Sequence, residues 1–236
     1  MDWDQARYPP QDTDARVFLR QFDGDGIELM DESDPSNRMI RPTKVLAVGS
    51  NEEDTANILS DAGFQVVGFD LREPVLSHMQ SPRYSHYIGD FVTAGFYPNE
   101  SFDHAYSLSA IEHFGFPCYE GSPVDLDYDV KAMDRMWDLL RWGGCCWITV
   151  PYGREPLLCY PLWRVYDQNM LRKRIVRKFS VETMLFFKSN PDCQGHKDFP
   201  KDADGIEWVP QAEADAWRCE PEKPHQTVFL KMRKDR

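Results

Sequence analysis

Short apolar runs separated by polar segments occupy the middle of the chain, starting at Lys44. Short apolar runs of this kind are typical of strands buried within a parallel sheet. The pattern therefore predicts five strands, at residues 44–49, 65–70, 84–88, 102–108 and 145–151.

Two helices are predicted between these strands. Residues 54–62 repeat small and apolar side chains at a spacing of three. A longer helix begins at Asp127 or Asp129, either of which can cap it, and runs to about Trp142 with apolar residues three and four apart. The glycine pair Gly143-Gly144 is expected to end this helix.

The fold class follows from the order of these elements. Residues 179–187 and 226–232 alternate apolar and polar positions, which favours a C-terminal antiparallel pair. We predict an α/β, Rossmann-like, seven-stranded, mostly parallel sheet with helices on both faces. Residues 1–42 form an N-terminal extension that packs on the core or covers its ligand, and residues 43–236 form the main domain, with an insertion at about 189–224.

Composition narrows the class of protein. Hydrophobic residues make up 42% of the 236 residues and charged residues 28%, which is a globular composition. The formal net charge of -12 disfavours nucleic acid as a partner. No apolar run approaches the roughly 20 residues that cross a bilayer, and the N-terminus lacks a signal-peptide pattern. The adjacent Cys145 and Cys146 suit a reducing compartment, so we expect a cytoplasmic protein without membrane contact.

Candidate ligand-binding residues follow the strands, because open α/β sheets bind ligands at the carboxyl ends of their strands. Asp70 ends the second strand about 20 residues after the first loop, where an acidic residue is the usual acceptor for ribose hydroxyls. Asp70 can also simply cap a turn. The candidates after the first, third and fourth strands are Gly49, Ser50, Asn51, Asp90, Phe91, Ser107 and Leu108.

The segments VLAVGS, GFD, GDF, FDHAYSLSAIEH and LLRWGGCCWITVP, in this order, resemble the class I S-adenosylmethionine-dependent methyltransferases. The resemblance covers residues 44–151 directly, and the last two strands match the family's antiparallel tail. A weaker likeness points to small bacterial-type enzymes that methylate sugars or other metabolites. The resemblance implies S-adenosylmethionine as cofactor, with the methionine part facing Gly49, Ser50 and Asn51, the ribose at Asp70, the adenine at Asp90 and Phe91, and the sulfonium above Ser107 and Leu108.

The first loop departs from the family's pattern. The family commonly has an acidic residue two positions before the first glycine and two further glycines. This chain has Ala47, Asn51 and Glu53 at those positions. Asn tolerates positive φ, whereas Glu53 is bulky and negatively charged. The departure leaves open a rearranged loop, weaker cofactor binding or lost activity.

His113 is the candidate general base, because histidine titrates near neutral pH and follows the fourth strand, where the transferred methyl should point. The alternative is a histidine that bonds to neighbouring backbone and shapes the loop. Glu112 either orients His113, contacts the substrate, or begins a helix.

Four residues after the fifth strand are candidates for substrate binding: Tyr152, Arg154, Arg164 and Tyr166. Arginine binds carboxylates and phosphates with paired donors, so an anionic or sugar-linked substrate fits. Salt bridges within the acidic surface are the alternative. The basic run at residues 171–178 (LRKRIVRK) is expected to form the exposed end of a helix.

These observations predict a methyltransferase that acts on a small molecule, with O-methyl transfer to a sugar or related metabolite as the narrower hypothesis. A catalytically inactive binding or scaffold protein is the alternative. A nucleotide-dependent oxidoreductase is disfavoured, because the first loop lacks the second and third glycines of that fingerprint. We predict no metal site, and the 189–224 insertion forms either a substrate lid or a homodimer contact. The candidate zinc ligands that we set aside are Cys193, His196, Cys219 and His225.

Overall fold

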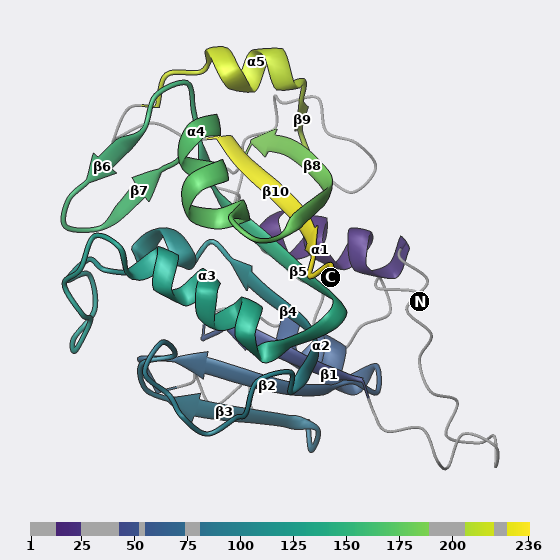
Figure 1. The fold of residues 1–236 in the computed structure, drawn as a ribbon. Helices are drawn as coiled ribbons and strands as arrows, with labels where there is room; N and C mark the ends of the chain where they lie inside the picture. Colours follow the sequence, from purple (N-terminus) through teal and green to yellow (C-terminus); the bar gives the residue numbers. More distant parts are fainter. Residues whose placement is uncertain (1–12, 25–42, 52–54, 74–80, 189–205, 220–225) are drawn as a thin grey trace.

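One eight-stranded sheet, in the order β3-β2-β1-β4-β5-β10-β8-β9, runs through the molecule (Figure 1). The computed structural model describes residues 13–24, 43–51, 55–73, 81–188, 206–219 and 226–236. The strands of this sheet are β1 (Lys44–Val48), β2 (Gln65–Asp70), β3 (Tyr84–Ile88), β4 (Phe102–Leu108), β5 (Leu140–Tyr152), β8 (Ser180–Lys188), β9 (Trp208–Val209) and β10 (Gln226–Arg233).

The strand directions confirm the predicted Rossmann-like α/β sheet. Strands β1 to β5 pair in parallel, whereas β10 lies antiparallel between β5 and β8. The sheet has one strand more than expected, because the two-residue β9, within the predicted insertion, pairs with Phe186 and Phe187 of β8. A separate hairpin of β6 (Leu157–Cys159) and β7 (Trp163–Val165) follows β5.

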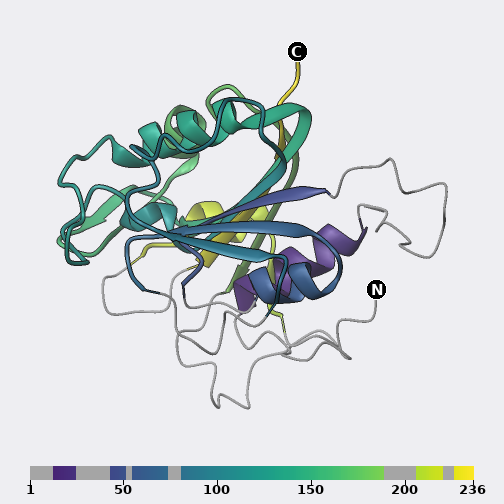
Figure 2. The ribbon, with the colours of Figure 1, turned by 90° about the horizontal axis from the view of Figure 1, so that it is seen from below.

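Helices cover both faces of the sheet, as predicted (Figure 2). Buried side chains of α1 and α2 pack against one face, and those of α3 and the π-helix η5 pack against the other. The helices are α1 (Thr13–Gly24), α2 (Thr55–Asp61), the 3-10 turn η4 (Ile111–His113), α3 (Tyr128–Leu139), α4 (Gln168–Met170), η5 (Leu171–Val176) and α5 (Gln211–Ala216).

Helix α1 lies in the predicted N-terminal extension and packs on the core. Its residues Val17, Phe18 and Phe22 are buried. The ring of Phe18 lies 4.8 Å from that of Tyr106 on β4 and 5.7 Å from that of Trp147 on β5, measured between centroids. Aromatic side chains bury large apolar areas, so α1 contributes to the same core as the sheet.

The end of helix α3 differs from the prediction. The helix stops at Leu139, and Gly143 and Gly144 lie inside β5 rather than at the helix end. Gly143 has a φ of +80°, and a Cβ at Gly144 would lie 2.6 Å from the carbonyl oxygen of Asp103. The pairing of β4 with β5 shifts register near this point, so the glycines serve a strand irregularity.

The start of α3 also differs from the prediction. Asp127 occupies the N-cap position, but its side chain makes no capping hydrogen bond. Its carboxylate accepts a hydrogen bond from Arg174 instead.

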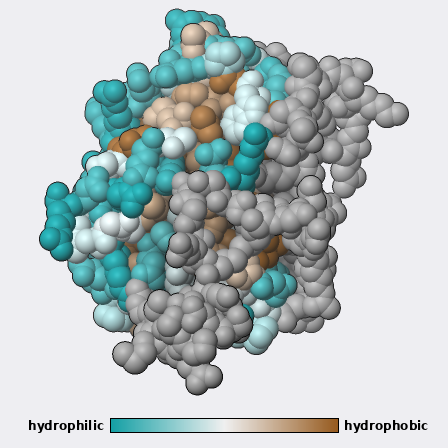
Figure 3. All heavy atoms as spheres, turned by 90° about the vertical axis from the view of Figure 1, so that its right-hand side faces the viewer, coloured by the Kyte–Doolittle hydropathy of each residue, from teal (hydrophilic) through white to brown (hydrophobic). Residues whose placement is uncertain are grey.

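Hydrophilic residues form the rim of the described surface in Figure 3, and hydrophobic residues gather between them. Among the residues that the structure describes, no helix is long and apolar enough to cross a membrane.

Candidate functional site

A cavity opens at the carboxyl ends of β1, β2 and β4, the edge where the sequence predicts ligand binding. Its empty space, which includes open solvent at the mouth, amounts to about 990 Å³. The residues that line it are Gly49, Phe69, Asp70, Leu71, Arg72, Gly89, Asp90, Phe91, Leu108, Ser109, Ala110, His113, Phe114, Gly115, Tyr119, Ser122, Pro123 and Tyr128.

The predicted site residues divide into two groups. Those that line the cavity are Gly49, Asp70, Asp90, Phe91, Leu108 and His113. Those that lie behind its wall are Ser50, Asn51, Ser107 and Glu112, all of which are buried. The Ser107 hydroxyl, for example, donates to the carbonyl of Val48 at 2.9 Å, which joins β4 to β1. Glu53, the main departure from the family's loop, lies outside the described residues.

Gly49 forms the turn after β1 in a conformation that requires glycine. Its φ is +73°, and its N–H donates to the Phe69 carbonyl at 2.8 Å. A Cβ at this position would lie 2.4 Å from the Cβ of Ala110, far inside van der Waals contact. The turns after β1 and β4 therefore approach each other closely enough to form one wall of the cavity.

Asp70 at the end of β2 binds its neighbour Arg72. The Arg72 Nε lies 3.0 Å from Oδ1 of Asp70 and its Nη2 lies 3.2 Å from Oδ2. The backbone N–H of Asn51 also donates to Oδ2, at 3.3 Å. Asp70 therefore links the turns after β1 and β2 while its carboxylate faces the cavity.

Asp90 organises the turn after β3. Its Oδ1 accepts from the backbone of Val92 at 3.0 Å, and its Oδ2 accepts from the hydroxyls of Thr93 and Tyr128. Burial, together with the hydrogen bond to Asp90, raises the pKa of Tyr128, so its hydroxyl stays protonated as a donor. The neighbouring Phe91 is largely buried and also borders the cavity.

His113 ends the turn η4 and faces the cavity. Its Nδ1 lies 2.8 Å from the carbonyl oxygen of Leu162, in the loop between β6 and β7. A neutral ring that donates from Nδ1 has its lone pair at Nε2. The contact with Leu162 fits the alternative role, in which His113 holds the loop. The tautomer with hydrogen on Nδ1 also fits a general base, because its Nε2 can accept a proton.

Ser109 was not among the predicted residues, although it lines the cavity. Its φ is +44°, and its backbone N–H donates to Oγ1 of Thr149 at 2.9 Å. Its hydroxyl donates to Asp14 of α1, which also accepts from the Thr149 hydroxyl at 2.8 Å. Asp14 is 1% exposed, so a buried acidic residue of the first helix holds the turn after β4.

Asp14 and Ser109 are 95 positions apart in the sequence. No spacing signal indicates this contact. The two serines Ser107 and Ser109 at the end of a predicted strand were the one available hint.

The four predicted substrate residues are not among those that line this cavity. Arg164 is 1% exposed, and Tyr166 is fully buried. The hydroxyl of Tyr152 donates to Asp215 at 2.5 Å. Arg154 is exposed and lies 3.8 Å from Glu155.

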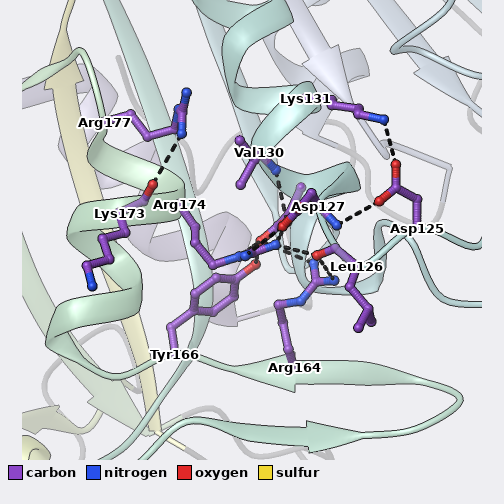
Figure 4. A network of polar contacts seen from close by, with 11 residues as sticks. Asp125, Leu126, Asp127, Val130, Lys131, Arg164, Tyr166, Lys173, Arg174 and Arg177 are labelled. Atoms are coloured by element: carbon purple, nitrogen blue, oxygen red, sulfur yellow. Dashed lines mark hydrogen bonds and ion pairs between the residues drawn. The ribbon is translucent and has the colours of Figure 1, made fainter.

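Arg164 and Tyr166 belong to a buried polar network instead (Figure 4). Both contact the fully buried carboxylate of Asp129, Arg164 at 3.2 Å and Tyr166 at 2.9 Å. Arg174 binds the same carboxylate through Nε at 2.9 Å and Nη2 at 2.6 Å. Burial raises the pKa of Tyr166, so its hydroxyl remains a donor. The network joins α3, η5 and β7.

The basic run at 171–178 is helical over 171–176, and Arg172, Lys173, Arg177 and Lys178 are exposed, as predicted. It forms the π-helix η5, in which Leu171 and Ile175 are buried and Arg174 reaches Asp129. Its last residues, Arg177 and Lys178, pair with Asp134 at the surface. Of the four candidate zinc ligands, Cys193, His196 and His225 lie outside the described residues.

Comparison with known proteins identifies the fold. A family profile described as "Caenorhabditis protein of unknown function, DUF268" matches residues 78–180. No curated protein matches the chain.

Among solved structures, the chain resembles the Burkholderia thailandensis 1,6-didemethyltoxoflavin-N1-methyltransferase with bound 1,6-didemethyltoxoflavin and S-adenosylhomocysteine (TM-score 0.57, 18% identity, 99% of this chain and 81% of that chain). It also resembles a SAM-dependent methyltransferase from Methanosarcina mazei (TM-score 0.54, 10% identity, 85% and 96%). A third similar structure is the cyclase SpnF (TM-score 0.55, 15% identity, 82% and 76%). The chain therefore has the class I methyltransferase fold.

Replacing Gly49 with Ala tests the close approach of the two turns. We expect Gly49→Ala to lower the free energy of unfolding by about 2–4 kcal/mol, because it adds a clash with Ala110 to the strain of a positive φ. Gly121 is the matched control, since it has a φ of +79° and a Cβ added there would have no atom within 4 Å. Urea unfolding should show a clearly smaller loss for Gly121→Ala. Equal losses would mean that the Ala110 contact does not matter.

Replacing Asp129 with Asn tests the buried network. We expect a loss of about 3–5 kcal/mol in unfolding free energy, because two guanidinium groups lose their shared carboxylate. Asp134→Asn is the control, since Asp134 pairs with Arg177 and Lys178 at the surface and should cost about 0–1 kcal/mol. A similar small loss in both variants, measured by chemical denaturation, would contradict a stabilising role for the network.

Proposed function

We propose that this protein is an S-adenosylmethionine-dependent methyltransferase that acts on a small molecule. The supporting observation is the cavity at the carboxyl edge of a class I methyltransferase fold, with Gly49 at the turn after β1 and Asp70 at the end of β2. Structures with this fold include a methyltransferase crystallised with S-adenosylhomocysteine and its substrate. At these low identities the likeness supports the fold, and the cavity's residues support the activity.

The residues of the cavity fit this cofactor. Gly49 lets the turns after β1 and β4 lie close together, since a Cβ there would clash with Ala110. Asp70 provides carboxylate oxygens for ribose hydroxyls. Asp90 and Phe91 offer an acceptor and an apolar edge for adenine, and Leu108 lies at the floor. In this proposal Ser50, Asn51 and Ser107 support the wall from behind. The cofactor brings an activated methyl group, and the protein aligns it with the acceptor.

We propose His113 as the base that takes a proton from the acceptor. Two observations support this proposal: the contact with Leu162 orients the ring, and His113 lines the cavity. Glu112 is buried behind the wall, so its role in the proposal is limited to the η4 turn. A hydroxyl of a sugar or related metabolite remains the narrower hypothesis for the acceptor.

A binding protein without methyl transfer is the second candidate. The observation in its favour is the first loop, where Asn51 and Glu53 replace two of the family's glycines. The likeness to the cyclase SpnF adds that this fold also occurs in a protein named for another reaction.

Calorimetric titration tests the cofactor assignment. We expect S-adenosylmethionine and S-adenosylhomocysteine to bind in the micromolar range and NAD not to bind. Asp70→Ala should weaken S-adenosylhomocysteine by about 10- to 100-fold, because a hydrogen-bonded charged acceptor is lost. Asp61→Ala, at the exposed end of α2, should bind as wild type does. Unchanged affinity in the Asp70 variant would place the ribose elsewhere.

Replacing His113 separates catalysis from binding. We expect His113→Gln to slow release of S-adenosylhomocysteine from reactions with an acceptor found by screening hydroxyl compounds. The dissociation constant for S-adenosylhomocysteine should stay near wild type, because the histidine serves the acceptor. Asp61→Ala, at the exposed end of α2, is the control here as well. Wild-type turnover of His113→Gln would remove the histidine from the mechanism.

A further inference from the structure

The carboxylate of Asp70 accepts four hydrogen bonds from described residues. Oδ1 accepts from the backbone N–H of Arg72 at 2.9 Å and from its Nε at 3.0 Å. Oδ2 accepts from the backbone N–H of Asn51 at 3.3 Å and from Nη2 of Arg72 at 3.2 Å. An ionised carboxylate has about four lone-pair sites. The acceptor capacity of Asp70 is therefore in use before any nucleoside arrives.

The four donors differ in how easily they can leave. Asn51 N and Arg72 N belong to the backbone of the turns after β1 and β2, so they move only if the turns move. Nε and Nη2 belong to a side chain that is 29% exposed. These two side-chain donors contact one carboxylate oxygen each, which is also how two adjacent ribose hydroxyls would pair with Asp70.

Arg72 makes a second contact while it is bound to Asp70. The guanidinium carbon lies 4.3 Å from the centroid of the Tyr119 ring, within the range of a cation–π interaction. Tyr119 lines the same cavity, so the guanidinium lies between the carboxylate and an aromatic face of the cavity wall. Arg72 is the only lysine or arginine among the described lining residues.

We propose that Arg72 occupies the ribose subsite when the cavity is empty and competes with nucleosides for Asp70. Its side chain imitates the two hydroxyls of a ribose, and a nucleoside binds by displacing it. Arg72 thereby lowers the affinity of the site and raises its selectivity, because only a ligand with two suitably placed donors replaces both bonds. The inference rests on the proposed function, since it takes Asp70 as the ribose acceptor.

The sign of the expected effect distinguishes this proposal from an ordinary binding role. Removing a residue that contacts the ligand weakens binding, whereas removing an internal competitor strengthens it. The Asp70–Arg72 pair is charge-assisted but partly exposed, so its loss should tighten binding by about 3- to 30-fold.

The experiment compares Arg72→Ala, Arg72→Gln and wild type by calorimetry, with S-adenosylhomocysteine, adenosine and 2′,3′-dideoxyadenosine as ligands. We expect both variants to bind S-adenosylhomocysteine and adenosine about 3- to 30-fold more tightly than wild type. Dideoxyadenosine lacks both ribose donors, so its affinity should change by less than about twofold.

Arg141→Ala is the matched control, because Arg141 also pairs with a carboxylate, that of Asp103 at 2.6 Å, but lies outside the cavity lining. It removes the same charge and should leave all three affinities unchanged. If wild type binds S-adenosylhomocysteine and neither Arg72 variant binds it more tightly, the competition does not exist. An equal gain for dideoxyadenosine would also overturn the proposal. If no form of the protein binds S-adenosylhomocysteine, the proposed function itself fails.

Discussion

The parallel alignment of β1, β2 and β4 brings three turns to one edge of the sheet, and the approach of Gly49 to Ala110 joins two of them into a wall. The polar contacts of Asp70 and Ser109 connect these turns to each other or to a neighbouring strand. Asp70 bonds to the turn after β1, and Ser109 bonds to the end of β5. Because these links cross between strands far apart in sequence, the cavity is a property of the sheet rather than of a single loop.

Much of the architecture could be predicted because it depends on local patterns. The apolar runs mark the parallel strands, and the alternation at the end of the chain marks β8 and β10. The role predicted for Gly143 and Gly144 was wrong. A glycine that ends a helix and a glycine that permits a strand irregularity look alike in sequence. Only the nearby Asp103 carbonyl shows which role applies to Gly144.

The candidate site was less predictable, for a physical reason. Residues directly after strands, such as Asp70, Asp90 and His113, lie in the cavity as expected. Arg164 and Tyr166 instead face inward, because Asp129, more than thirty positions earlier, provides a buried partner. A charged residue's exposure depends on such partners, and one sequence does not reveal them. Arg72 and Tyr128 were missed because nothing in their local pattern indicates a cavity.

Asp14 gives the first helix an influence on the ligand site that its distance in sequence conceals. Its carboxylate accepts hydrogen bonds from the hydroxyls of Ser109 and Thr149. The stability of α1 and the conformation of the turn after β4 therefore depend on each other. Coupling of this kind is reciprocal in free energy. A ligand that stabilises the turn after β4 therefore also stabilises α1. Slower hydrogen exchange at the backbone amides of α1 would then indicate that the cavity is occupied.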